Sequence, residues 1–91
     1  MALTKETVVD KIEVLEMGQV QVRTATRVLE DGVELSSSFH RHVVVPSVKT
    51  GDTWADTDIS GEDARVQAIA TATWTSAVKT AYQEMVDAQA I

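Results

Sequence analysis

Three runs of alternating apolar and polar residues fill the first 45 positions, and this pattern constrains the fold more than any other feature. Because successive side chains of a β-strand point to opposite faces, each run predicts a strand with one apolar face. The residues expected on that face are Val8, Asp10, Ile12, Val14, Val20, Val22, Thr24, Thr26, Val28, Val33, Leu35, Ser37, Phe39, Arg41, Val43 and Val45.

A short turn is expected between the first two runs. Pairing Leu15 with Gln19 leaves residues 16–18 as a three-residue loop, with Gly18 at the left-handed position that such loops require. The strand partners that follow are Val14 with Val20 and Ile12 with Val22.

The second turn is expected at Asp31-Gly32, a dipeptide typical of two-residue type I′ turns. Pairing Glu30 with Val33 around it joins the second run to the third. The further partners in this register are Val28 with Leu35, Thr24 with Phe39 and Val20 with Val43. Both registers place the apolar residues on one face, which predicts a three-stranded antiparallel meander over residues 7–45.

The rest of the chain changes character after Pro46, which cannot donate a hydrogen bond to a sheet and is expected to end the third strand. Residues 46–60 are rich in Ser, Thr, Asp and Gly, and we expect a loop with Trp54 as its anchor. Ser60, followed three positions later by Asp63, is typical of a helix start, so residues 61–90 are expected to be helical.

One apolar stripe runs through the expected helical segment, and we expect it to lie across the sheet. Thr75 can also cap a second helix, so the pattern leaves open whether the segment is one helix or two. The stripe consists of Val66, Ile69, Ala70, Thr73, Ala77, Ala81 and Met85, flanked by Trp74 and Val78. The chain is thus expected to be a single α+β domain over residues 1–91.

Composition excludes several classes of function. A 91-residue chain buries a thin core, so self-association is expected to add stability. It has no cysteine and therefore no disulfide or thiolate chemistry. A net charge of -6 argues against nucleic acid as a partner. The longest apolar stretch, residues 43–46, is too short to cross a membrane, and residues 1–6 lack the features of a signal peptide.

His40 and His42 are the first candidate site, because they share one face of a strand, expected to be the polar face opposite Arg23 and Gln21. Two histidines are an incomplete metal shell, although three chains together would supply six nitrogens. A solvated or interface pair is the favoured interpretation, so we expect no metal site in the chain.

The other candidates also favour structural roles. Asp52, Asp56 and Asp58 do not meet the spacing of a calcium-binding EF-hand loop. The serines at 36–38 lie near His40 in sequence but lack a third orienting group and a strained turn. Trp54 and Trp74 are expected to be core anchors or oligomer contacts. We therefore expect no catalytic residue, no cofactor and no small-molecule substrate.

Apolar residues also occur on the expected polar face, and two strand edges, 8–16 and 33–45, are expected to be unpaired. Such a surface is typical of assembly contacts, but scattered apolar side chains are equally common on monomers. These residues are Val9, Leu15, Ala25, Leu29 and Val44.

Six stretches of the chain resemble short uncharacterised proteins of tailed bacteriophages, including marine and cyanobacterial phages. They are Lys11–Val14, Val20–Thr26, Glu30–Ser36, Phe39–Val43, Ser60–Glu62 and Trp74-Thr75. The resemblance implies a non-catalytic structural protein of the virion, made in the host cytoplasm and partnered by other virion proteins and by copies of itself. A tail or appendage adaptor or decorating subunit is favoured. The alternative is a small acidic host-directed binding protein made during infection.

Overall fold

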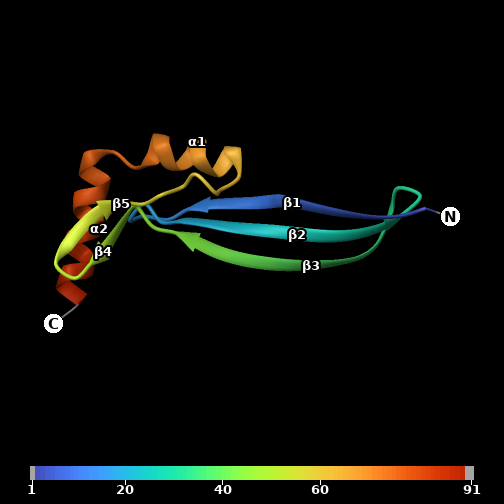
Figure 1. Ribbon diagram of the computed structural model, residues 1–91, viewed down its shortest axis with the longest axis horizontal. Coiled ribbons are helices and arrows are strands. Elements are labelled where there is room, and N and C mark those ends of the chain that lie inside the picture. Colours follow the sequence, from blue (N-terminus) through green and yellow to red (C-terminus); the bar gives the residue numbers. More distant parts are fainter. Residues whose placement is uncertain (1, 90–91) are drawn as a thin grey trace.

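Residues 2–89 are described by a computed structural model, and they form an antiparallel three-stranded sheet followed by two helices, as Figure 1 shows. Strand β1 spans Leu3–Val14, β2 spans Val20–Glu30 and β3 spans Val33–Val44, in the order β1-β2-β3. This layout confirms the expected α+β meander. The first strand begins at Leu3 rather than at residue 7, because backbone pairing with β2 extends into a polar stretch that has no apolar period.

A small β-hairpin occupies most of the expected loop 46–60, so the prediction of a structureless loop was wrong. Strand β4 spans Ser47–Thr50 and pairs with β5, which spans Thr53–Asp56. Gly51 lies between them with a φ of 62°, a left-handed conformation that glycine adopts readily. Strands of four residues are too short to show a clear alternating pattern, so no strand could be predicted here.

The helical segment consists of two helices, which settles the alternative that the sequence left open. Helix α1 spans Ala64–Thr73 and helix α2 spans Ser76–Gln89. Asp63, rather than Ser60, caps α1, because its carboxylate accepts the Arg65 backbone N–H at 2.9 Å. The Thr75 hydroxyl accepts the Val78 backbone N–H at 3.3 Å, so Thr75 caps α2 as expected.

The expected single stripe across the sheet is correct for α1 but wrong for α2. Val66 and Ala70 of α1 are buried against the sheet, and Arg65 donates a hydrogen bond to the Val9 carbonyl of β1. Helix α2 turns away and packs beside β4 (Figure 1), where Ala77 and Ala81 are exposed. The turn at Trp74 redirects the chain, so Ala77 and Ala81 no longer share a face with the buried residues of α1, whereas Val78 still packs against the core.

The register of the first hairpin agrees with the sequence near its turn and departs from it at a β-bulge. Val14 pairs with Val20 and Ile12 with Val22, as expected. Farther along, Asp10 is an extra residue, since Val9 pairs with Thr24 and Lys11 with Arg23. A bulge shifts the alternation by one residue, so the positions of β1 before Asp10 exchange faces.

The second hairpin has the expected turn and a second bulge. Asp31 and Gly32 have φ values of 51° and 84°, which fit a type I′ turn, and Glu30 pairs with Val33. Leu35 is then the extra residue, which corrects the expected register by one position. The observed partners are Val28 with Ser36, Thr24 with His40 and Val20 with Val44.

The core lies at one end of the molecule, where α1 covers one face of the sheet (the covered face). It consists of Val20, Val22, Val44, Val66, Ala70 and Trp74. The indole N–H of Trp74 donates to the Gly18 carbonyl at 2.6 Å, which confirms Trp74 as a core anchor. The sheet continues well beyond the helices, so the molecule measures 57 × 26 × 22 Å (Figure 1).

Candidate interaction surface on the open face of the sheet

The face of the sheet opposite α1 (the open face) carries three neighbouring rows of side chains that differ in chemistry. Cross-strand pairing places Lys11, Arg23 and Arg41 side by side, and we call them the cation row. The next row toward the hairpin tip is apolar and consists of Val8, Ala25 and Phe39. The row beyond it consists of Glu6, Arg27 and Ser37, with Glu34 one row farther, and we call these four the acidic end.

Arg23 at the centre of the cation row is held by the bulge in β1. Its guanidinium donates two hydrogen bonds to the Asp10 carboxylate, at 2.9 and 2.8 Å. The side-chain hydrogen bond from Arg23 lowers the pKa of Asp10, and the same bond raises the pKa of Arg23. The guanidinium carbon also lies 4.5 Å from the centre of the Phe39 ring. Arg23 therefore joins the cation row to the apolar row.

The outer cations of the row differ in how they are partnered. Lys11 forms an ion pair with Glu13 at 3.0 Å, whereas Arg41 forms no ion pair within residues 2–89. A shallow groove of about 140 Å³ runs along the row and is also lined by Gln21 and Val43. Three cations directly across a sheet repel one another, so the row is favourable for carboxylates from outside the chain.

The apolar row presents one large side chain to solvent. Phe39 is 51% exposed and Val43, on the same face, is 53% exposed, whereas Ala25 on the central strand is buried. The sequence placed Phe39 and Val43 on the buried face, and this was wrong because the Leu35 bulge reverses the alternation between the turn and these residues. The reversal puts an aromatic ring of edge strand β3 on the uncovered face.

The acidic end of the open face is a small ion-pair network. Arg27 contacts Glu6 at 3.1 Å and Glu34 at 3.5 Å, so two carboxylates share one cation. Both carboxylates remain about half exposed. Leu3, Val33 and Leu35 near the hairpin tip are also exposed, which leaves this part of the sheet open on both faces.

His40 and His42 lie on the covered face, opposite Thr24 and Val22, and the expected position opposite Arg23 and Gln21 was wrong. The bulge at Leu35 is again the cause. The two rings are stacked with centroids 6.4 Å apart, and His42 Nε2 lies 2.7 Å from a carboxylate oxygen of Glu62. Among residues 2–89 no three metal-binding side chains converge on a common point. The favoured interpretation, a solvated or interface pair without a metal, stays a prediction.

The acidic residues of the 52–58 segment are not brought together. Asp56 pairs with Lys79 of α2 at 3.0 Å, and Asp58 accepts the Ser60 backbone N–H at 2.9 Å. That backbone hydrogen bond lowers the pKa of Asp58. Asp52 lies in the exposed turn of the β4–β5 hairpin. The serines at 36–38 lie along exposed β3, and the described residues show no hydrogen bond between them and His40.

Trp54 packs at the helical end, apart from the core around Trp74. Its ring meets Tyr82 of α2 edge to face, with centroids 6.3 Å apart, and Lys49 Nζ lies 5.6 Å from the ring centre. Lys49 also pairs with Asp87 at 2.8 Å, and this hydrogen bond lowers the pKa of Asp87 and raises that of Lys49. Trp54 therefore anchors the β4–β5 hairpin to α2.

The cation row was missed by the sequence reasoning, but two residues carried a signal for it. Asp10 and Arg41 are charged residues at positions assigned to the buried face. Burying an unpaired charge is costly, so each of these residues indicates that strict alternation assigns this part of the strand to the wrong face. A bulge on the turn side of Arg41 and another at Asp10 resolve both conflicts.

Comparisons with protein-family models, with curated proteins and with solved structures found no match. Neither of the two helices described is long and apolar enough to cross a lipid bilayer.

Proposed function

We propose that the chain is a non-catalytic structural protein of a phage particle, a tail or appendage adaptor or decorating subunit that acts in repeated copies through protein–protein contacts. One observation carries the proposal. A long three-stranded sheet extends beyond its helical cover (Figure 1). Apolar side chains are exposed on both of its faces. Exposed apolar surface of this kind is typical of interaction sites.

The size of the core supports an assembly role. Six residues form the buried cluster, and all lie at the end near α1. The sheet farther out is held by its ladder hydrogen bonds and by surface ion pairs, which contribute little stability each. Contact with neighbouring subunits would bury this part of the sheet and add the hydrophobic stabilisation that a small chain lacks.

The elongated shape suits an adaptor. The helical end and the tip of the Asp31-Gly32 hairpin lie at opposite ends of a molecule 57 Å long. The two ends also differ in surface, because α2 and the β4–β5 hairpin carry polar pairs whereas the sheet carries exposed apolar residues. A subunit with two unlike ends can join two different neighbours.

We place the protein in the phage particle because six stretches of its sequence resemble short proteins of tailed phages. In this proposal the chain is made in the host cytoplasm and ends in the virion, where other virion proteins and further copies are its partners. The open face offers polar and apolar groups suited to protein surfaces. The whole chain carries a charge of -6, which argues against nucleic acid as a partner.

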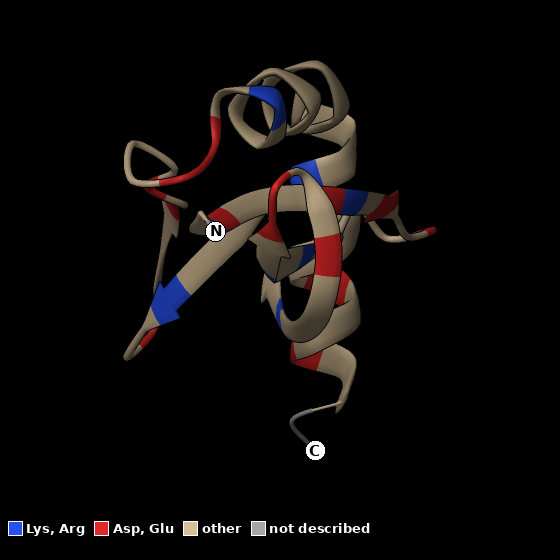
Figure 2. Ribbon diagram, turned by 90° about the vertical axis from the view of Figure 1, so that its right-hand side faces the viewer, with Lys and Arg blue, Asp and Glu red and all other residues tan. Residues whose placement is uncertain are grey.

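A host-directed acidic binding protein is the second candidate, and the placement of charge favours it. Residues 46–89 contain seven acidic and three basic residues, so this part of the chain has an excess of negative charge. Figure 2 shows that the strands, in contrast, carry both signs of charge. An acidic surface of this kind would suit a basic host target.

The content of purified particles separates the two candidates. Virions purified on a density gradient would be digested and quantified by mass spectrometry, with a phage-encoded replication enzyme as the contamination control. A structural subunit is expected at a fixed copy number relative to the major capsid protein. If the chain is present in infected cells but absent from particles at the level of that control, the structural role is overturned and the host-directed role is favoured.

A further inference from the structure

We infer that the open face of one copy packs against the open face of a second copy, with the strands antiparallel and a two-fold axis passing through the apolar row. This inference deepens the proposed role as a repeated structural subunit and rests on it. It places Phe39 on the axis, at the β3 side of the interface, where the two Phe39 rings meet. Aromatic pairs of this kind contribute strongly to interfaces.

The order of the rows is what makes the open face complementary to itself. A two-fold axis between the sheets and perpendicular to the strands reverses the strand direction and lays each strand over its own copy. The rows on either side of the axis then exchange partners. The cation row of each copy lies over the acidic end of the other, and the apolar rows coincide.

The outer strands supply the charge pairs across this interface. Lys11 of β1 lies over Glu6 of the partner subunit, and symmetry repeats the pair. On β3, Arg41 lies over the partner subunit's Ser37, a small residue that leaves room for the guanidinium to reach Glu34 of the partner subunit. Arg41 forms no ion pair within residues 2–89, so it is available for this contact.

The middle strand brings two like charges together, and each is already neutralised. Arg23 lies over Arg27 of the partner subunit in this arrangement. Arg23 is held by Asp10, and Arg27 is held by Glu6 and Glu34 of its own chain. These ion pairs within each chain therefore weaken the repulsion between Arg23 and Arg27 of the partner subunit.

The extent of the face meets the requirement of a weak to moderate dimer. Three strands about 4.8 Å apart and roughly 37 Å long give a flat footprint of roughly 500 Å² for each copy. Two copies thus bury roughly 1,000 Å², the lower bound for a specific interface. Two such sheets pack face to face about 10 Å apart, with their strands inclined by about 30° as twisted sheets prefer.

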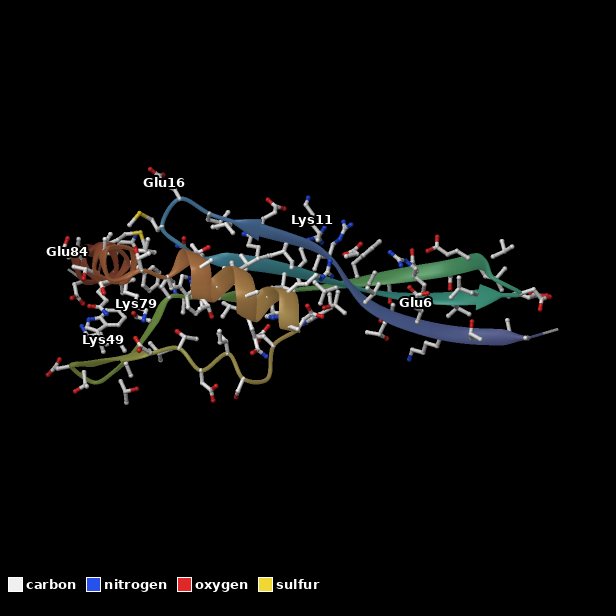
Figure 3. The ribbon with its side chains drawn as sticks, turned by 90° about the horizontal axis from the view of Figure 1, so that it is seen from above. Glu6, Lys11, Glu16, Lys49, Lys79 and Glu84 are labelled. Atoms are coloured by element: carbon white, nitrogen blue, oxygen red, sulfur yellow. The ribbon has the colours of Figure 1, made fainter. Side chains whose placement is uncertain are left out.

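Charge reversal at one predicted pair tests the contact directly. Lys11 and Glu6 lie at separate points of β1, as Figure 3 shows, about 15 Å apart along an extended strand. They do not contact each other within one chain, so any rescue must come from a second chain. Sedimentation velocity would measure the dimer dissociation constant of the full chain, of Lys11→Glu, of Glu6→Lys and of the double variant. Each single variant is expected to weaken the dimer about tenfold or more, and the double variant to restore it to within about threefold.

Phe39→Ser tests the apolar contact on the two-fold axis, with Val33→Ser as its matched control. Both residues are more than half exposed, but Val33 pairs with Glu30 and lies on the other face, next to the hairpin turn. Phe39→Ser is expected to be monomeric at concentrations where the control remains dimeric. Near-ultraviolet circular dichroism from the buried Trp74 would establish that both variants are folded.

Three outcomes overturn the inference: a monomeric full chain at millimolar concentration, a dimer that Phe39→Ser leaves intact, or a double charge variant that is weaker than either single variant. An intact Phe39→Ser dimer would place the contact elsewhere, and a monomer would leave the open face to a different virion protein. These results are independent of particle composition. A monomer found at fixed copy number in virions overturns the dimer alone, whereas a dimer absent from virions overturns the proposed function alone.

Discussion

At the scale of residues, the most informative contact is the one between Asp10 and Arg23. Asp10 is the extra residue of the β1 bulge, and its carboxylate accepts hydrogen bonds from the Arg23 guanidinium. The same guanidinium lies over the Phe39 ring. Sequence alternation assigned Asp10 to the buried face, where an unpaired carboxylate would be unfavourable. The pairing shows that the bulge lets the chain keep a charge there and use it to position the cation row.

This pairing predicts a pH-dependent contribution of Asp10 to stability. Its pKa is lowered from 3.8 in the folded protein, chiefly by the side-chain hydrogen bond from Arg23. A group whose pKa is lower when folded stabilises the protein above its unfolded pKa and loses that effect as the pH falls through the folded value. Asp10→Asn is therefore expected to be less stable than the parent chain at pH 7, and the difference is expected to shrink as the pH falls below 3.8.

Urea unfolding at a series of pH values would measure this difference. Asp58→Asn is the matched control. The pKa of Asp58 is also lowered, but by a hydrogen bond from the Ser60 backbone rather than by an arginine. High salt should reduce the Asp10 effect more than the Asp58 effect, since Asp10 is paired with a charge. A stability difference at Asp10 that stays constant from pH 7 to pH 2 would contradict the account.

At the scale of elements, the turns were predictable and the bulges were not. Gly18 and Gly32 adopt the left-handed conformations that the sequence indicated, and the strand pairs next to both turns were correct. A bulge adds one residue without a specific sequence signature, so the register beyond Leu35 was wrong by one. The faces of His40, His42 and Phe39 depended on that register, which is why the residues of the open face were predicted wrongly.

Helix α2 is the element with the weakest tertiary support. None of its described residues is fully buried, and Val78 alone among them packs against the core from the first turn. The rest of the helix is tied to the β4–β5 hairpin by polar and aromatic contacts. One is an ion pair between Lys79 and Asp56, and another is a hydrogen bond from Gln83 to Ser47. Exposed pairs of this kind contribute little, so local features such as the cap have a large share in holding the helix.

Removal of the α2 cap is expected to destabilise the helix by about 1 kcal/mol, because the Thr75 hydroxyl accepts the Val78 N–H that would otherwise be unpaired. Thr75→Ala and the control Thr80→Ala, an exposed interior position of α2, would be compared by hydrogen exchange of α2 amides. Faster exchange confined to α2 in Thr75→Ala is the expected result. Equal exchange in both variants would show that the cap contributes nothing.

At the scale of the whole molecule, the chain combines a small core at one end with a sheet that is largely uncovered. The short length of the chain and the apolar residues on both faces of the sheet lead us to expect self-association. The face used for association was not predicted, because the bulges at Asp10 and Leu35 determine which charged residues share a face. The observed rows place cations, apolar residues and carboxylates in an order that is self-complementary under a two-fold axis.

The measurement that tests this account most directly is the mass of the full chain in solution by light scattering, over a range of concentrations and with and without a chelator. The account predicts a reversible shift from the 9.9 kDa monomer to twice that mass, unaffected by the chelator. Loss of association on chelation would instead favour a metal shared through His40 and His42. A mass of 9.9 kDa at every concentration would contradict the self-complementary open face.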